Sequence, residues 1–199
     1  MFPTKTAMPI ASLLAALLAG PAALAQPAAD DNGPQVINGC PIWPYTRCPG
    51  ADLRHANLVG KNLAGADLRG ADLSRADLRG ANLAAADLEG ANLTGARLNK
   101  ATAANTNFQR ARFIGTDLEA ARLMRSDFSH AEFNGASLEI ARLNNAWFVG
   151  TRFVASNLQE AKFVSTNLKD AFFEANVLRY AIFPDSLMEG CKNCPEAWR

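Results

Sequence analysis

The sequence predicts an all-β solenoid, a chain that turns a corner every five residues between residues 51 and 190. Counting in fives from Leu53 to Met188 gives 28 positions, and all are Leu or Phe except Ala103 and Met188. A small residue, usually Ala, stands two places earlier, and Asp or Asn often lies between. A period of five fits neither an α-helix nor a flat strand. We expect the large and the small residue to point inward and the other three to face water, with Gly or Asn easing each corner.

Units such as ADLRG, ADLSR, ANLTG and TNLKD resemble the pentapeptide-repeat family, whose pattern is A-(D/N)-(L/F)-x-x. The resemblance covers residues 51–190. It implies a right-handed quadrilateral β-helix in which four units make one coil, so the repeats would form about seven coils. With a strand-like spacing of ~4.8 Å between coils, the stack would be roughly 34 Å long.

Four-sided coils predict that residues 20 apart stack in one interior column. One such column is all Leu, and another changes once from Leu to Phe and stays Phe, as stacking of like side chains requires. These core positions are Leu58, Leu78, Leu98, Leu118, Leu138, Leu158 and Leu178 in the first column, and Phe113, Phe133, Phe153 and Phe173 in the second. Ala103 leaves one gap in its column, between Leu83 and Leu123.

The N-terminal residues predict export. Residues 1–25 contain an apolar stretch after Lys5 and end in the small residues Ala23 and Ala25, which predicts a signal peptide cut between Ala25 and Gln26. An uncleaved membrane anchor is the alternative. Residues 26–39 are rich in Pro, Gly and polar residues, and we expect a flexible leader. Removal of residues 1–25 takes away one Lys and leaves a net charge of zero, so we expect a periplasmic or secreted protein that does not bind nucleic acid.

Both ends of the repeat carry cysteines, and we expect residues 40–50 and 191–199 to cap the solenoid. The length expected for the stack keeps its ends too far apart for a disulfide between them. We therefore expect the pairs Cys40–Cys48 and Cys191–Cys194, which suit an oxidising compartment. A thiol redox role for Cys191 and Cys194 is the alternative, although the flanking sequence lacks a thioredoxin-like pattern.

The last coil carries apolar residues where other coils carry outward Asp or Asn. These residues are Phe172, Val177, Ile182 and Leu187. We expect something to cover them. One interpretation is that the tail folds back through Trp198, and the other is a homodimer contact or docking site for a partner.

A catalytic site is not predicted. The two histidines, His55 and His130, fall at corners several coils apart, and the many Asp residues fit the polar step of the repeat. We expect no enzyme activity, no metal and no cofactor. One outer face gathers cations at equivalent positions, namely Arg122, Arg142 and Lys162 with Arg125 beside them. This basic face could meet an anionic envelope polymer or a lipid headgroup surface, or it could simply be solvated.

These observations favour a non-enzymatic exported scaffold that presents a rigid surface to an envelope partner. The resemblance implies one rival, because some cytosolic members of the family resemble DNA in shape and charge and bind DNA gyrase. Those members are acidic dimers. The export signal, the neutral mature charge and outward arginines such as Arg97, Arg112 and Arg152 depart from that pattern.

Overall fold

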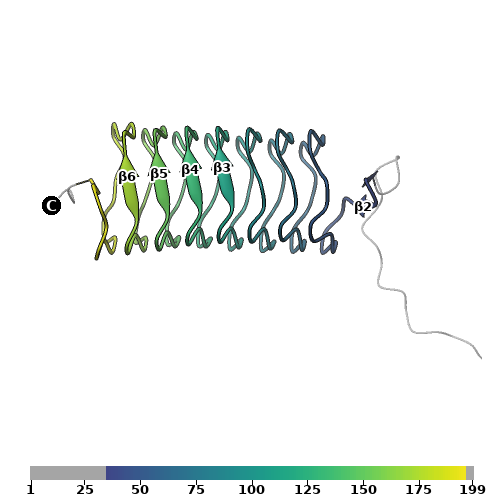
Figure 1. The fold of residues 1–199 in the computed structure, drawn as a ribbon, viewed down its shortest axis with the longest axis horizontal. Coiled ribbons are helices and arrows are strands. Elements are labelled where there is room, and N and C mark those ends of the chain that lie inside the picture. The colour runs from purple at the N-terminus through teal and green to yellow at the C-terminus, as the bar shows by residue number, and fades with distance from the viewer. Residues whose placement is uncertain (1–34, 196–199) are drawn as a thin grey trace, which may run out of the picture. The chain divides into compact units, whose positions relative to one another are not determined.

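The computed structural model describes residues 35–195, and its repeats form a stack of flat-sided coils (Figure 1). The N-terminal edge is a hairpin in which β1 (Val36–Ile37) pairs antiparallel with β2 (Cys40–Pro41). One side of the stack carries a parallel sheet in the order β3-β4-β5-β6. Its strands are β3 (Arg112–Ile114), β4 (Glu132–Asn134), β5 (Arg152–Val154) and β6 (Phe172–Glu174). No helix occurs within residues 35–195, so the predicted all-β class is confirmed.

The coils repeat every 20 residues, as the interior columns predict. Phe113 lies opposite Phe133, and isolated parallel bridges with the same separation run from Arg47↔Asp67 to Phe172↔Lys192. The unit around Leu58 shows how the backbone N–H and carbonyl groups are hydrogen-bonded. The Leu58 N–H donates to the carbonyl of Asp77 at 2.8 Å, and the Asp77 N–H donates back to Ala56 at 2.9 Å. Each unit is therefore held mainly by its neighbours in adjacent coils.

The outward Asp or Asn completes the hydrogen bonding of its own unit. The N–H of the residue two places later donates to its side-chain oxygen, as from Ser74 to Asp72 at 2.9 Å and from Ala84 to Asn82 at 3.1 Å. This Asx contact satisfies an N–H that makes no bond to a neighbouring coil. It gives a physical reason for Asp or Asn at the second position of the unit.

The interior is filled by the predicted columns. Phe113, Phe133 and Phe153 are fully buried, and their rings stack with centroids 4.5 and 4.9 Å apart. The Leu column is buried from Leu58 to Leu158, but Leu178 is partly exposed, contrary to the expectation that it belongs to the core. The reason is its place in the last coil, because no further coil among the described residues covers that end.

Each corner uses a left-handed backbone at the fifth residue of the unit. Glycine supplies it at Gly60 (φ 64°), whereas Ala120 adopts it at φ 56° and Ile140 at φ 49°. Within residues 35–195, Ile140 is the only β-branched residue with a positive φ. That conformation crowds the Cβ of any residue other than glycine and is most unfavourable for a branched one. Ile140 is therefore a strained choice.

The N-terminal boundary differs from the prediction. Residues 26–39 were expected to be a flexible leader, but Val36 and Ile37 pair with Cys40 and Pro41 across a turn at Asn38 and Gly39. Both turn residues have positive φ, 48° and 81°. An Asn-Gly pair is the strongest short-range signal for a tight hairpin, so this part of the leader belongs to the N-terminal cap. The expected signal peptide, residues 1–25, and the expected cleavage at Ala25–Gln26 lie outside the described residues.

Candidate interaction surface

The chain offers flat outer faces. Its core is filled by side chains that are almost completely buried. Within residues 35–195, no group of three or more His, Cys, Asp or Glu side chains could hold a metal ion. His55 and His130 lie at corners of different sides, at φ 57° and 61°. Side chains that could act on a ligand are therefore found on the outside of the coils.

A search of the described residues finds no helix long and apolar enough to span a membrane.

The N-terminal coils neutralise their charges within single units. Asp67 accepts hydrogen bonds from Nε and Nη2 of Arg69 at 2.8 and 2.7 Å, and Asp77 is held in the same way by Arg79 at 2.7 Å. The side-chain hydrogen bonds from these arginines lower the pKa of both carboxyls. The corresponding hydrogen bond from Arg54 lowers the pKa of Asp52 to about 2. These acids stay ionised and paired.

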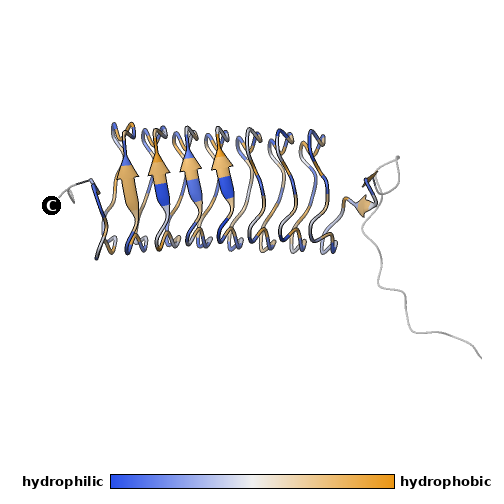
Figure 2. Ribbon diagram, viewed as in Figure 1, coloured by the Kyte–Doolittle hydropathy of each residue, from blue (hydrophilic) through white to orange (hydrophobic). Residues whose placement is uncertain are grey.

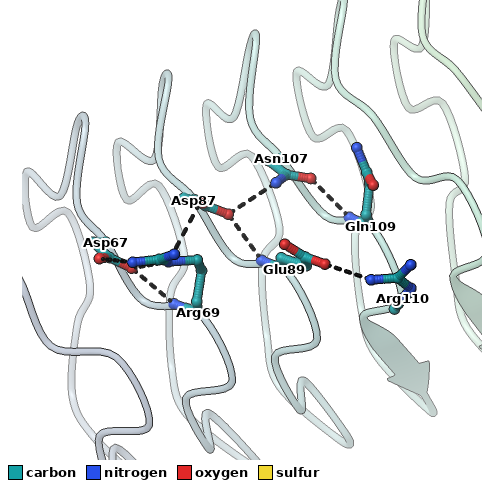
Figure 3. Close-up of polar contacts among 7 residues, drawn as sticks. All are labelled: Asp67, Arg69, Asp87, Glu89, Asn107, Gln109 and Arg110. Carbon is teal, nitrogen blue, oxygen red and sulfur yellow. Dashed lines mark hydrogen bonds and ion pairs between the residues drawn. The ribbon is translucent and has the colours of Figure 1, made fainter.

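Figure 3 shows how this pairing continues from coil to coil. Arg69 also reaches Asp87 in the next coil at 3.6 Å, and Asn107 donates to Asp87 at 2.9 Å. Glu89 accepts from Arg110 at 2.7 Å. Each of these acids lies next to an arginine of its own or an adjacent coil, so the surface presents little uncompensated charge to a ligand.

The sheet face alternates charge in the same manner. Arg112 of β3, Glu132 of β4 and Arg152 of β5 occupy equivalent outward positions in successive coils. Arg112 Nε lies 3.9 Å from the Glu132 carboxylate. Opposite charges placed directly across neighbouring strands stabilise a sheet. The fold therefore accommodates an alternating column of charge at the second position of the unit.

The opposite face of the coils, two units further along the chain, breaks this rule. Arg122, Arg142 and Lys162 are bridged in register as Arg122↔Arg142 and Arg142↔Lys162, and all three are exposed. We call these three residues the basic ladder. None of them forms an ion pair with another described residue. Three like charges therefore follow one another at the spacing of the coils, an arrangement that destabilises a sheet.

Arg125 lies at the corner that follows Arg122, with φ 60°. The structure thus brings Arg122, Arg142 and Lys162 into one row, as the sequence predicts, and places Arg125 at the edge of that row.

The basic ladder also leaves backbone donors open. In this part of the chain, the second position of the unit holds a cation and not Asp or Asn, so the Asx contact is missing. The N–H groups of Met124, Asn144 and Val164 have no hydrogen-bond acceptor among the described residues. These residues are only partly buried. Each coil of the ladder therefore presents one cation and one open N–H on the same face.

A shallow groove follows the ladder on one side. It is lined by the ladder together with Lys100, Ala120, Ile140 and Glu160, which succeed one another along the adjoining corner. Ile140 is 41% exposed in the middle of this row. Ile140 was not predicted as a site residue, although a β-branched residue at the fifth position of a unit is a recognisable signal in the sequence.

The last coil is apolar on its outside, as its sequence predicts. Val177, Ile182 and Leu187 are 51%, 43% and 50% exposed. Phe172 differs because the guanidinium of Arg152 lies over its ring at 4.8 Å, and it is only partly exposed. Figure 2 shows the same change, since β6 begins with a hydrophobic residue where β3, β4 and β5 begin with a charged one. Trp198, which was expected to cover this coil, lies outside the described residues.

Both cysteine pairs are joined as disulfides, Cys40 to Cys48 and Cys191 to Cys194. Cys40 and Cys48 are buried in the N-terminal cap, and Cys191 and Cys194 pack against the end of the core. Thus the four cysteines lie at the two ends of the stack and leave the basic ladder untouched.

Several known proteins share this architecture. The family described as pentapeptide repeats matches with 8 copies, over residues 47–83, 81–119, 104–139, 121–159, 141–174 and 156–192. The solved structure of HetL, a pentapeptide repeat protein involved in heterocyst differentiation regulation in the cyanobacterium Nostoc sp. strain PCC 7120, is 30% identical over 74% of each chain, with a TM-score of 0.39. A trypsin-treated form of QnrB1, a plasmid-mediated fluoroquinolone resistance protein, is 16% identical over 73% of this chain and 70% of its own, with a TM-score of 0.51.

No curated protein matches the sequence. At its level of identity, QnrB1 shows the fold alone. Proteins built from these repeats are right-handed quadrilateral β-helices and are generally non-enzymatic structural or interaction proteins. The family predicted from the units of five residues is therefore confirmed, together with its four-sided β-helix. The chain belongs to the pentapeptide repeat family.

Proposed function

We propose that this protein is an exported, non-enzymatic scaffold whose rigid β-helix presents an outer face to a partner in the cell envelope. The observation that carries the proposal is the basic ladder, because three unpaired cations in register are a feature that stability alone does not favour. Elsewhere on the coils arginines pair with acids, as Arg69 does with Asp67 and Arg79 with Asp77, and the sheet face places Arg112 beside Glu132. Natural proteins commonly give up stability where a surface must bind.

A β-helix suits this role physically. Its coils are tied together by regular backbone hydrogen bonds and by stacked Phe rings, so neighbouring outward side chains keep a constant spacing. Because side chains fill the core, recognition of a partner depends on the outer surface. Binding energy on such a surface comes from preorganised groups, because the scaffold loses little conformational entropy when it binds.

The export part of the proposal has two supports. The residues before Gln26 have the composition of a secretory signal, and the four cysteines pair as two disulfides at the ends of the stack. Disulfides of this kind persist in oxidising compartments. A redox role for Cys191 and Cys194 has no further support, since the chain that precedes them forms stacked coils and not a thioredoxin-like βαβ unit.

DNA mimicry is a weaker candidate. A DNA-like surface needs rows of unpaired acids, whereas Asp67 and Asp77 are each held by an arginine of the same unit. The basic ladder is opposite in sign to such a surface. The fold shared with QnrB1 gives the shape alone.

Cell fractionation followed by intact-mass measurement tests the proposed location of the protein. We expect a periplasmic species that begins at Gln26 and is about 4 Da lighter than its reduced form, since each disulfide removes two hydrogens. A reduced, full-length species confined to the cytosol would contradict export and would return gyrase to consideration.

A further inference from the structure

We propose that the basic ladder binds a linear polyuronate, a polysaccharide that carries a carboxylate on its successive sugar rings. This inference rests on the proposed function and names the partner of that same face. It begins from what the ladder lacks. In most other units an Asp or Asn oxygen accepts the N–H two residues later, and on the ladder no oxygen does so.

The paired units of the same chain show how a carboxylate is held here. The Asp67 carboxylate accepts from the Arg69 guanidinium at 2.8 Å and from the Arg69 backbone N–H at 3.4 Å. Asp77 repeats this with Arg79 at 2.7 and 3.3 Å. A carboxylate that receives one cation and one backbone N–H from a single unit is thus a recurring element of this fold.

The ladder supplies the same two donors without the carboxylate. Arg142 provides the cation, and Asn144, two residues later, provides the open N–H. Arg122 with Met124 and Lys162 with Val164 repeat the pair in the adjacent coils. The cation here stands at the second position of the unit, where Asp67 stands in its own unit, so a ligand carboxylate would come from outside the coil and accept from the cation and from the open N–H. The geometry therefore points to an external chain of carboxylates.

The distance between coils indicates which kind of anionic chain fits the ladder. The coils follow one another at the distance shown by stacked Phe rings, 4.5 to 5.0 Å. One sugar ring of a polyuronate advances its chain by a similar length, and the long Arg and Lys side chains can reach carboxylates that point to either side of that chain. An extended acidic peptide advances about 3.3 Å per residue, and its same-side carboxylates are about 6.6 Å apart, so neither spacing matches that of the coils.

The surroundings of the ladder favour a narrow ligand with an apolar face. Glu119 and Glu139 lie on the adjoining side, three residues before Arg122 and Arg142, and would repel a broad anionic plane such as a membrane. Ala120 and Ile140 line the groove beside the cations. An exposed Ile in a strained corner conformation has no structural benefit, but it offers a surface to the C–H face of a sugar ring.

Binding of polygalacturonate fragments to the purified protein, followed by calorimetry, tests the inference. We expect affinity to rise with fragment length until three successive carboxylates are engaged, and to fall steeply as salt is added. Neutral dextran should not bind. Vesicles of phosphatidylglycerol and duplex DNA should bind more weakly than polygalacturonate, and tighter binding of either would overturn the choice of ligand.

Two triple variants with the same change in net charge provide the control. R122N/R142N/K162N removes the ladder and restores an Asx acceptor in each unit, so it should fold at least as stably as the parent and bind about 100-fold more weakly. R54N/R69N/R79N removes three arginines that are already paired and should change affinity less than about threefold.

Equal weakening in both variants, or no binding by the parent protein, would overturn the polyuronate site. The proposed scaffold function would survive either outcome if the protein is exported and captures another envelope partner. A cytosolic location of the protein would instead contradict the proposed exported scaffold, whatever the result with polygalacturonate.

Discussion

Replacing Arg142 by Asp should stabilise the fold, although it removes a natural residue from the surface. Arg142 stands between Arg122 and Lys162 in register, so the change converts two like-charge neighbours into two opposite-charge neighbours. It also returns an acceptor to the N–H of Asn144, as Asp72 does for Ser74 at 2.9 Å. The substitution imitates the alternation of Arg112, Glu132 and Arg152 on the sheet face.

The magnitude follows from these contacts. Each cross-strand charge pair contributes roughly 0.2–1 kcal/mol, and an exposed hydrogen bond adds about 0.5 kcal/mol to the free energy of unfolding. We therefore expect R142D to gain about 1–2 kcal/mol. For a chain of this size that raises Tm by about 3–6 °C. R142N restores only the hydrogen bond and should gain about 0.5 kcal/mol.

Thermal unfolding followed by circular dichroism, at low and at high salt, measures both parts. The charge contribution should shrink in salt, and the hydrogen-bond contribution should remain. R152D is the matched control, because Arg152 lies next to Glu132 and over the Phe172 ring, so the same substitution there should lower Tm. If R142D melts at or below the temperature of the parent protein, the ladder carries no cost in stability, and the reasoning from its charge pattern is refuted.

Further predictions concern the corner residue Ile140, the core position Ala103, stability at acid pH and residues 196–199. Ile140→Asn should raise the free energy of unfolding by about 1 kcal/mol by relieving a strained corner, and should weaken polygalacturonate binding; a lower Tm would contradict the strain. Ala103→Leu should raise Tm by filling a gap in its column, since the reverse change in a core costs about 2–5 kcal/mol, and a lower Tm would show the space already filled. The pKa of Asp52 falls from 3.8 to about 2 on folding, so its contribution to stability is complete above pH 3.8 and is lost as the pH falls through about 2; Arg54→Gln should raise the pH midpoint of acid unfolding, and an unchanged midpoint would contradict this. Removing residues 196–199 should turn a monomer into a dimer in light scattering if the tail covers the last coil, whereas a dimer formed equally by both chains would assign that cover to a second copy.

The fold could be predicted from the sequence because one inward position dominates its energetics. Leu or Phe at every fifth residue determines which side chains face inward, and the change from Leu93 to Phe113 already indicates stacking between coils. Leu178 was misjudged because a periodic pattern does not reveal where the last covering coil ends. The hairpin at Asn38 and Gly39 was missed because it lies in a polar segment without periodicity.

The candidate surface was only half predictable. The row of Arg122, Arg142 and Lys162 follows from a separation of 20 residues, so sequence alone places the cations together. The open N–H groups of Met124 and Asn144 could not be foreseen, because they depend on which backbone donors the neighbouring coils leave unused. A hydrogen bond that is absent leaves no trace in composition or periodicity.

Photo-crosslinking around a single coil, in intact cells, tests the central claim most directly. A photoreactive amino acid is placed in turn at Glu139, Asn144, Val149 and Val154, which occupy the same place in four successive units and so sample the four sides. An envelope adduct formed from position 144 and from none of the other three is the result we predict. Adducts from the other sides with none from position 144, or adducts with cytosolic proteins alone, would contradict the assignment of function to the basic ladder.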